Sequence, residues 1–170
     1  MAPYDPCMPP PRTLTRTSTV PLPAPEVWTR VTSPAGIRHE LRPWLSMTMP
    51  PRLRGRTIED AAPLLGRPLG KAWLLAGGVV PVDFDDMVLV ALEPGRRFHE
   101  RSRMLLFPRW EHERTVAPVR GGTCTVTDRL TFVPRLPASH HVVALLFAHR
   151  HRRLRAWARG RPAQRSGADR

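Results

Sequence analysis

The sequence predicts a single α+β domain in which an antiparallel sheet is covered by a long C-terminal helix. The chain has 170 residues, enough for one domain, and 41% of them are hydrophobic, enough for an ordinary core. Between residues 71 and 133, extended segments follow one another across short turns, which indicates an antiparallel meander. Residues 140–159 then repeat apolar side chains at the spacing of one helical face.

The first part of the chain predicts one strand and two short helices. Threonines at every second position favour a strand over residues 12–20. Pro25 and Glu26 suit the first turn of a helix over residues 23–32, because proline fixes a helical φ and a carboxylate complements the helix dipole. A second short helix is predicted over residues 34–41.

The remaining chain predicts six more strands before the last helix. A strand over residues 44–49 is followed by a long connection, residues 50–70, which is rich in Pro, Gly and Arg. Further strands are predicted over residues 71–76, 86–92, 97–106, 109–119 and 123–133. The last helix must then cover the sheet, because its apolar face needs a partner.

The composition is strongly basic. Lys and Arg number 27 against 14 Asp and Glu, which gives a net charge of +13, and slightly more than half of the excess lies in residues 139–170. A basic-surface function, binding of nucleic acid or of an anionic membrane, therefore stays open as an alternative, although no recognition motif accompanies the charge. We expect disordered tails at residues 1–11 and 160–170 around a domain of residues 12–159.

Signals for a compartment or a cofactor are few. Two cysteines without metal-ligand spacing and an N-terminus without signal-peptide features favour a cytoplasmic protein, and no apolar stretch is long enough for a transmembrane segment. The sequence contains no P-loop, dinucleotide fingerprint, nucleophile elbow or HExxH motif, so we expect no cofactor and no metal. The acidic residues Asp83, Asp85 and Asp86 are interpreted as a solvated turn before a strand.

Several short motifs follow this order of elements. They are Ala24-Pro-Glu-Val-Trp28, Glu40-Leu-Arg-Pro-Trp44, Phe98-His-Glu-Arg-Ser102, Trp110-Glu-His-Glu-Arg114, Asp128-Arg-Leu-Thr-Phe132 and Phe147-Ala-His-Arg-His-Arg-Arg-Leu154. Over residues 12–158 the chain resembles the SRPBCC superfamily, with the START-like, helix-grip or Bet v 1-like fold, and within it an uncharacterised bacterial branch. The resemblance implies a curved seven-stranded sheet that grips the last helix around an apolar cavity. The superfamily includes lipid carriers, hormone receptors and polyketide cyclases.

Strand alternation predicts which side chains face that cavity. Trp110, His112 and Arg114 share one face of their strand, and this face is the more apolar one. The matching faces of the neighbouring strands carry Glu100, Ser102, Met104, Leu106, Val126, Asp128 and Leu130. Phe147 lies on the apolar face of the last helix.

Four ionisable groups, His112, Arg114, Glu100 and Asp128, are expected to converge on the inner face. One interpretation is a structural network, because buried charges are tolerated when they are paired and hydrogen-bonded. The other is that Arg114 or His112 faces a ligand and orients its polar group in an otherwise apolar pocket.

The sequence favours binding of a small hydrophobic or amphipathic molecule over catalysis. The expected walls are Trp110, Met104, Leu106, Val126, Leu130 and Phe147, and the expected polar anchor is Arg114, His112, Glu100 and Asp128, with Ser102 beside it. The alternative is a polyketide cyclase/aromatase-like enzyme, in which His112, tuned by Asp128 or Glu100, moves protons on a bound substrate.

Overall fold

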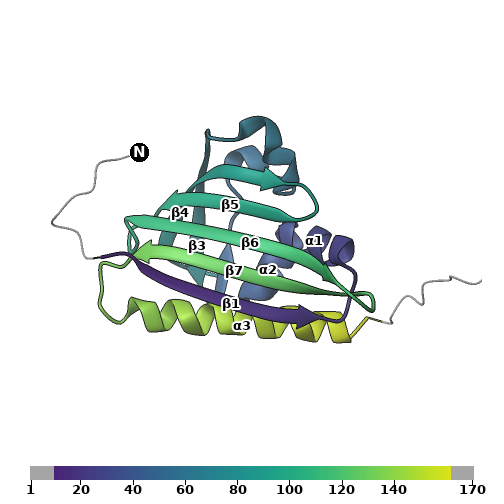
Figure 1. Cartoon of the computed structure of the whole chain (residues 1–170). Coiled ribbons are helices and arrows are strands. Elements are labelled where there is room, and N and C mark those ends of the chain that lie inside the picture. Colours follow the sequence, from purple (N-terminus) through teal and green to yellow (C-terminus); the bar gives the residue numbers. More distant parts are fainter. Residues whose placement is uncertain (1–9, 162–170) are drawn as a thin grey trace, which may run out of the picture.

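The computed structural model of the protein describes residues 10–161 and confirms the α+β class (Figure 1). Its strands are β1 (Arg12–Val20), β2 (Leu45–Met47), β3 (Pro68–Ala76), β4 (Val80–Glu93), β5 (Arg97–Arg103), β6 (Arg109–Val119) and β7 (Thr123–Val133). Its helices are α1 (Ala24–Thr32), α2 (Pro34–Leu41), the 3₁₀ helices η1 (Pro51–Leu53) and η2 (Glu59–Leu64), and α3 (Ser139–Arg159). The tails predicted at residues 1–11 and 160–170 lie almost wholly outside the described residues.

All seven strands form one antiparallel sheet in the order β1-β7-β6-β5-β4-β3-β2. The short turns set the register of the central strands, so that Arg114 on β6 stands opposite Asp128 on β7, and His112 stands opposite Glu100 on β5. Shifts of register between β3 and β4, and between β4 and β5, mark irregularities that bend this part of the sheet. The inner face thus curves around the helices.

Helix α3 runs along the sheet beside β1 (Figure 1). Helix α2 packs against the middle of α3, and α1 lies nearer the C-terminal end of α3. Val143, Phe147 and Leu154 are buried on the face that the helical spacing predicted. Burial of a side chain of this size contributes about 1.5–3 kcal/mol. Packing of this apolar face, rather than helix propensity, therefore holds the Arg-rich helix against the sheet.

Local contacts fix the helices and connections that close one end of the sheet. The Ser33 hydroxyl caps α2 by accepting a hydrogen bond from the backbone N–H of Gly36 at 3.0 Å. The Glu59 carboxylate of η2 accepts hydrogen bonds from the indole N–H of Trp28 and from the backbone N–H of Gly95. One carboxylate thus joins η2 to α1 and to the β4–β5 turn.

The structure corrects the sequence prediction around the acidic residues of β4. The strand begins at Val80 rather than at residue 86, so Asp83 and Asp85 lie inside it and are buried, not in a solvated turn. The Asp83 carboxylate accepts hydrogen bonds from the backbone N–H groups of Leu105 and Leu106 at 2.7 and 3.2 Å. These bonds stabilise the β5–β6 connection, and β5 accordingly ends at residue 103 instead of residue 106.

Candidate ligand cavity and its polar network

A cavity of about 230 Å³ lies between the inner face of the sheet and α3. Its walls are mainly apolar and include Ile37, Leu41, Leu53, Ile58, Met87, Phe98, Met104, Leu106, Phe107, Trp110, Val143, Leu146 and Phe147. An engineered protein cavity of about 150 Å³ binds benzene. The cavity is therefore large enough for an organic molecule with two fused rings.

The cavity reaches the surface between β4 and the first half of α3. Val82 on β4 and Val142 on α3 both line it, and they are 42% and 63% exposed. An exposed valine on each side of an apolar opening gives a ligand an apolar path from solvent to the interior.

Beside the cavity, buried charged side chains form a continuous network around Arg114. Its Nε and Nη2 donate to the two carboxylate oxygens of Asp128, both at 2.7 Å, and its Nη1 donates to Glu40 of α2 at 3.0–3.1 Å. Glu40 also accepts a hydrogen bond from Nε of Arg150 at 3.1 Å. Because Arg150 lies on α3, these groups connect α2, the sheet and the gripped helix.

Two histidines complete the network. The His112 ring nitrogens lie 3.0 Å from Glu100 and 2.7 Å from Asp128, so both carry protons when both carboxylates are ionised. His151 of α3 lies 2.8 Å from the second oxygen of Asp128 and 2.9 Å from the hydroxyl of Ser18 on β1. Asp128 thus receives hydrogen bonds from three side chains, and the network extends to the edge strand.

The ionisation of these groups follows from their partners. Burial opposes ionisation of Asp128, but the charge and hydrogen bonds of Arg114 and the bonds from the two histidines hold its pKa well below the usual range. Burial likewise lowers the pKa of His112, yet its bonds to Asp128 and Glu100 outweigh this and raise the pKa above the ordinary value. Burial also opposes the charge of Arg114, but the charges and hydrogen bonds of Asp128 and Glu40 outweigh it and raise the pKa of Arg114.

The structure brings together the four predicted ionisable groups but divides the predicted site between two places. Six of the predicted residues line the cavity: Trp110, His112, Glu100, Met104, Leu106 and Phe147. Five are outside the lining: Arg114, Asp128, Ser102, Val126 and Leu130. Arg114 is 1% exposed and fully engaged with carboxylates, so the network explains its burial without a ligand.

Sequence reasoning missed three members of the network and two acidic residues of the cavity wall, Asp83 and Asp85. Glu40, Arg150 and His151 come from helices, which strand alternation does not pair with a sheet. Asp85 lines the cavity from β4, and its Oδ1 is buried without a hydrogen-bond partner among residues 10–161. The apolar residues Val82 and Phe84 alternate with Asp83 and Asp85, and this period of two was the available signal of a strand.

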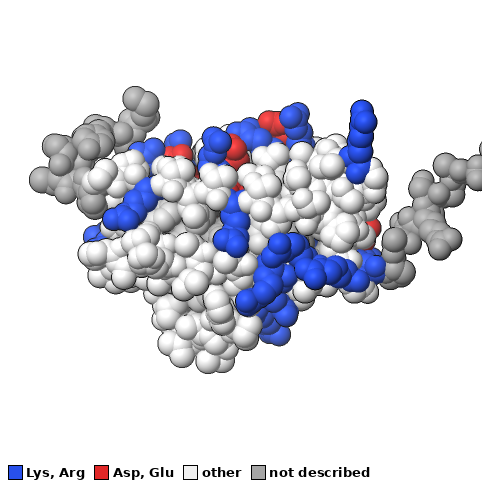
Figure 2. Space-filling model, turned by 60° about the horizontal axis from the view of Figure 1, so that its bottom comes forward, with Lys and Arg blue, Asp and Glu red and all other residues white. Residues whose placement is uncertain are grey.

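The basic run at the end of α3 is only partly a surface feature. Figure 2 shows Lys and Arg gathered over the C-terminal half of α3, where Arg152 and Arg159 are exposed. His149, Arg150 and His151 of the same run are buried, and His149 lies 2.7 Å from the carbonyl oxygen of Arg42. No helix in the described part of the chain is long and apolar enough to cross a membrane.

Residues 18–158 match the family described as "Domain of unknown function (DUF8410)". The chain belongs to this family. No curated protein matches the DUF8410 chain significantly in sequence. The family assignment runs from the end of β1 to α3 and therefore includes the cavity and the whole polar network.

Solved structures show which fold the DUF8410 domain has. Protein CV1439 from Chromobacterium violaceum is 17% identical, with a TM-score of 0.66 over 88% of this chain and 99% of the other. A START superfamily protein from Mycobacterium smegmatis is 10% identical, with a TM-score of 0.63 over 86% and 97%. The ZhuI aromatase/cyclase from Streptomyces sp. R1128 is 14% identical, with a TM-score of 0.62 over 88% and 94%. The domain therefore has the START-like helix-grip fold.

Proposed function

We propose that this protein binds a small hydrophobic or amphipathic molecule in the cavity between the sheet and α3. The observation that carries the proposal is the apolar cavity of about 230 Å³ with its apolar opening at Val82 and Val142. Apolar side chains that line a cavity lack packing partners on the cavity side. A ligand that fills the space restores those contacts, so binding is favourable without any change in the fold.

The polar network supports binding over proton-transfer chemistry at His112. Both of its ring nitrogens already face carboxylate oxygens, at 3.0 and 2.7 Å, so no nitrogen is left to accept a proton from a substrate. The rings of Phe98 and Phe147 also pack edge-on against the imidazole and hold its orientation. The cyclase/aromatase-like alternative gains no specific support from this geometry.

The proposal is tested by native mass spectrometry of the full chain, purified without detergent, with denaturing extraction of any retained molecule. Leu146 lines the cavity, whereas its neighbour Leu145 is 60% exposed on the same helix. We expect the wild type and Leu145→Trp to retain an apolar small molecule. We expect Leu146→Trp to lose it, because the indole fills the cavity.

Thermal unfolding shows whether both variants are folded before the masses are compared. Equal retention by folded Leu145→Trp and folded Leu146→Trp would place the molecule elsewhere and contradict the proposal. Absence of any retained molecule from the wild type, together with failure of added apolar probes to bind, would contradict it as well.

A further inference from the structure

The charges of the network balance one another, and Asp85 is left out of that balance. Glu100, Asp128 and Glu40 supply three negative charges, and Arg114, Arg150 and protonated His112 supply three positive ones. His151 binds Asp128 through one nitrogen and Ser18 through the other, so its neutral form satisfies both contacts. Every network carboxylate therefore has a cationic partner.

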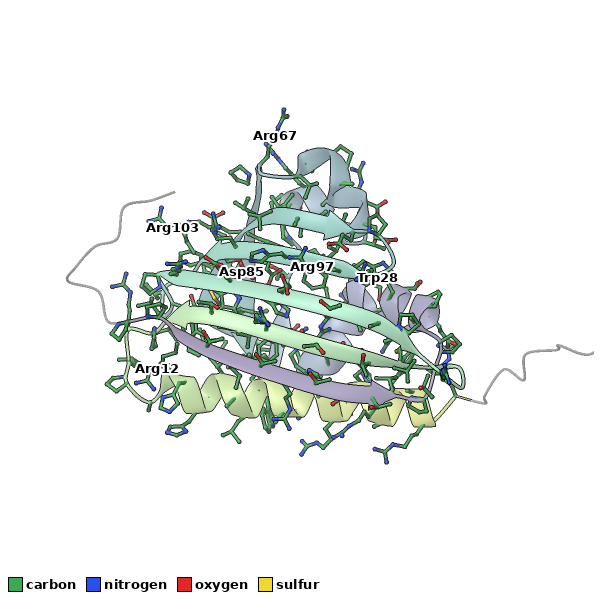
Figure 3. All side chains as sticks on the ribbon, in the orientation of Figure 1. Arg12, Trp28, Arg67, Asp85, Arg97 and Arg103 are labelled. Carbon is green, nitrogen blue, oxygen red and sulfur yellow. The ribbon has the colours of Figure 1, made fainter. Side chains whose placement is uncertain are left out.

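Asp85 has no such partner. It is 5% exposed, lines the cavity, and its Oδ1 lacks a hydrogen-bond donor anywhere in the described chain. Figure 3 shows it within the span of the sheet, whereas Arg67 and Arg103 point outward into solvent. Its charged neighbours are Glu100 on β5, His112 on β6 and Asp83 on its own strand.

Two other polar groups near Asp85, Asp83 and Ser102, do not supply it with a cationic partner. Asp83 is satisfied by the backbone N–H groups that close the β5–β6 connection. The Ser102 hydroxyl is close enough to favour ionisation of Asp85, but it is neutral, and within residues 10–161 its Oγ has no partner in hydrogen-bond geometry. Asp85 is thus a buried carboxylate that lines the cavity and has no cationic hydrogen-bond partner among residues 10–161.

We propose that the cavity selects an apolar molecule with a single protonated amino group, and that this group binds the carboxylate of Asp85. The inference rests on the proposed ligand-binding function and adds the chemical class of the ligand. An ammonium group would donate to the unpaired oxygen and neutralise the unmatched charge. A ligand hydroxyl would donate a hydrogen bond but would not neutralise the charge. A ligand carboxylate would be repelled by Asp85 and Glu100.

Arg150 also lines the cavity, from the α3 side, and a guanidinium would favour a ligand of the opposite charge, an anion. If it were the ligand anchor, the cavity would prefer an anion. However, Glu40 lies 3.1 Å from its Nε and already offsets its charge, whereas the Oδ1 of Asp85 has no hydrogen-bond donor in the described residues. The positively charged neighbour of Asp85, His112, is already paired with Glu100 and Asp128. The unmatched charge at the cavity wall is therefore negative.

The pH dependence of binding follows from the ionisation of Asp85. Burial, and then the nearby charge of Glu100, raise the pKa of Asp85 to about 7. The carboxylate is therefore mostly ionised at pH 8 and mostly neutral at pH 5.5. His112 keeps its charge at pH 5.5, because its pKa is raised. We expect the preference for an amine to be large at pH 8 and small at pH 5.5.

The experiment is isothermal titration calorimetry of the full chain with three probes that share a naphthalene body: 1-naphthylmethylamine, 1-naphthylmethanol and 1-naphthoic acid. At pH 8 we expect the amine to bind at least about tenfold more tightly than the alcohol, since hydrogen bonds to charged groups contribute about 1.5–3 kcal/mol. We expect the acid to bind more weakly than the alcohol.

Variants separate the role of Asp85 from a general effect of negative charge. In Asp85→Asn, we expect the amine and alcohol affinities to agree within about threefold, because the amide removes the charge that distinguishes the two probes. In the matched control Asp86→Asn, on the alternate face of β4, we expect the tenfold preference to persist.

The outcomes distinguish this inference from the proposed function. Binding of the alcohol with no preference for the amine, or a preference that survives in Asp85→Asn, would overturn the inference and leave the ligand-binding function intact. Tighter binding of the acid would assign the anchor to Arg150 instead. Failure of all three probes to bind the folded wild type would contradict the proposed function and this inference with it.

Discussion

Two neighbouring regions of the inner sheet face bury carboxylates in opposite ways. Asp128 receives hydrogen bonds from Arg114, His112 and His151, and its pKa lies well below the usual range. Asp85 is as deeply placed, but its Oδ1 has no donor in the described residues, and burial raises its pKa to about 7. Burial alone therefore does not determine the pKa of a buried carboxylate, because its hydrogen-bond donors and charged neighbours can shift the pKa in either direction.

The first region joins the layers of the fold. Through Arg114 and Asp128 it links Glu40 of α2 and His151 of α3 to the central strands, and through Ser18 it reaches β1. The second region, around Asp85, faces the cavity, and the Oδ1 of Asp85 has no hydrogen-bond donor among the described residues. This contrast separates residues that hold the sheet and α3 together from a residue that is free to meet a ligand.

The largest effect is expected from breaking the closed network. Asp128→Asn removes the charge that Arg114 and two histidines share, and leaves a buried guanidinium with Glu40 alone. We expect a loss of about 3–5 kcal/mol in the free energy of unfolding, measured by urea denaturation at pH 7. The control Glu113→Gln removes a partly exposed partner of Arg97 and should cost less than about 1 kcal/mol. Similar losses in the two variants would contradict the structural role of the network.

The second effect has the opposite sign and depends on pH. Because the pKa of Asp85 is raised on folding, the unfolded chain binds fewer protons at this residue than the folded chain as pH rises from about 4 to 7. Over that range the ionisable side chain progressively destabilises the fold. We expect Asp85→Asn to be more stable than the wild type by up to about 4 kcal/mol at pH 8, and the gain to shrink toward pH 4.

Urea denaturation at pH 4.5, 6 and 8 measures that gain, with Asp86→Asn as the control at each pH. A gain that is independent of pH, or a loss of stability at pH 8, would show that Asp85 has a cationic partner in the folded protein. Either result would remove the contrast between the two regions.

The smallest effects come from a matched pair of buried serines. The Ser18 hydroxyl bonds His151 at 2.9 Å, whereas the Ser102 hydroxyl has no partner within the described chain. We expect Ser18→Ala to lower the free energy of unfolding by about 1 kcal/mol and Ser102→Ala to change it by less than about 0.5 kcal/mol. Equal losses in chemical denaturation would mean that Ser102 also belongs to a closed hydrogen-bond network.

The sequence predicted the central sheet closely, because its signals there are local. Strict alternation and glycine-rich turns define β6 and β7, and both strands have the predicted bounds. The register across the turns also brought His112, Glu100, Arg114 and Asp128 together, as expected. Alternation and turn length suffice for contacts between neighbouring strands.

Alternation and turn length did not predict contacts between elements that are far apart in the sequence. Glu40 meets Arg150 across 110 positions of the chain, and nothing in the periodicity of either helix names the other as its partner. Asp83 and Asp85 were misassigned because acidic residues are rare on inward strand faces and common in turns. The polar group that most directly suggests a ligand was therefore hidden from the sequence pattern.

The most direct test is an NMR titration of the side-chain carboxyl carbons of Asp85 and Asp128, with and without 1-naphthylmethylamine. We expect Asp85 to titrate near pH 7 in the free protein and at a lower pH with the amine bound, because a nearby cation stabilises its charge. We expect Asp128 to remain ionised throughout and to be unaffected by the amine. An Asp85 titration that the amine leaves unchanged, or an Asp128 titration that shifts with it, would contradict the assignment of the ligand to the Asp85 side of the cavity.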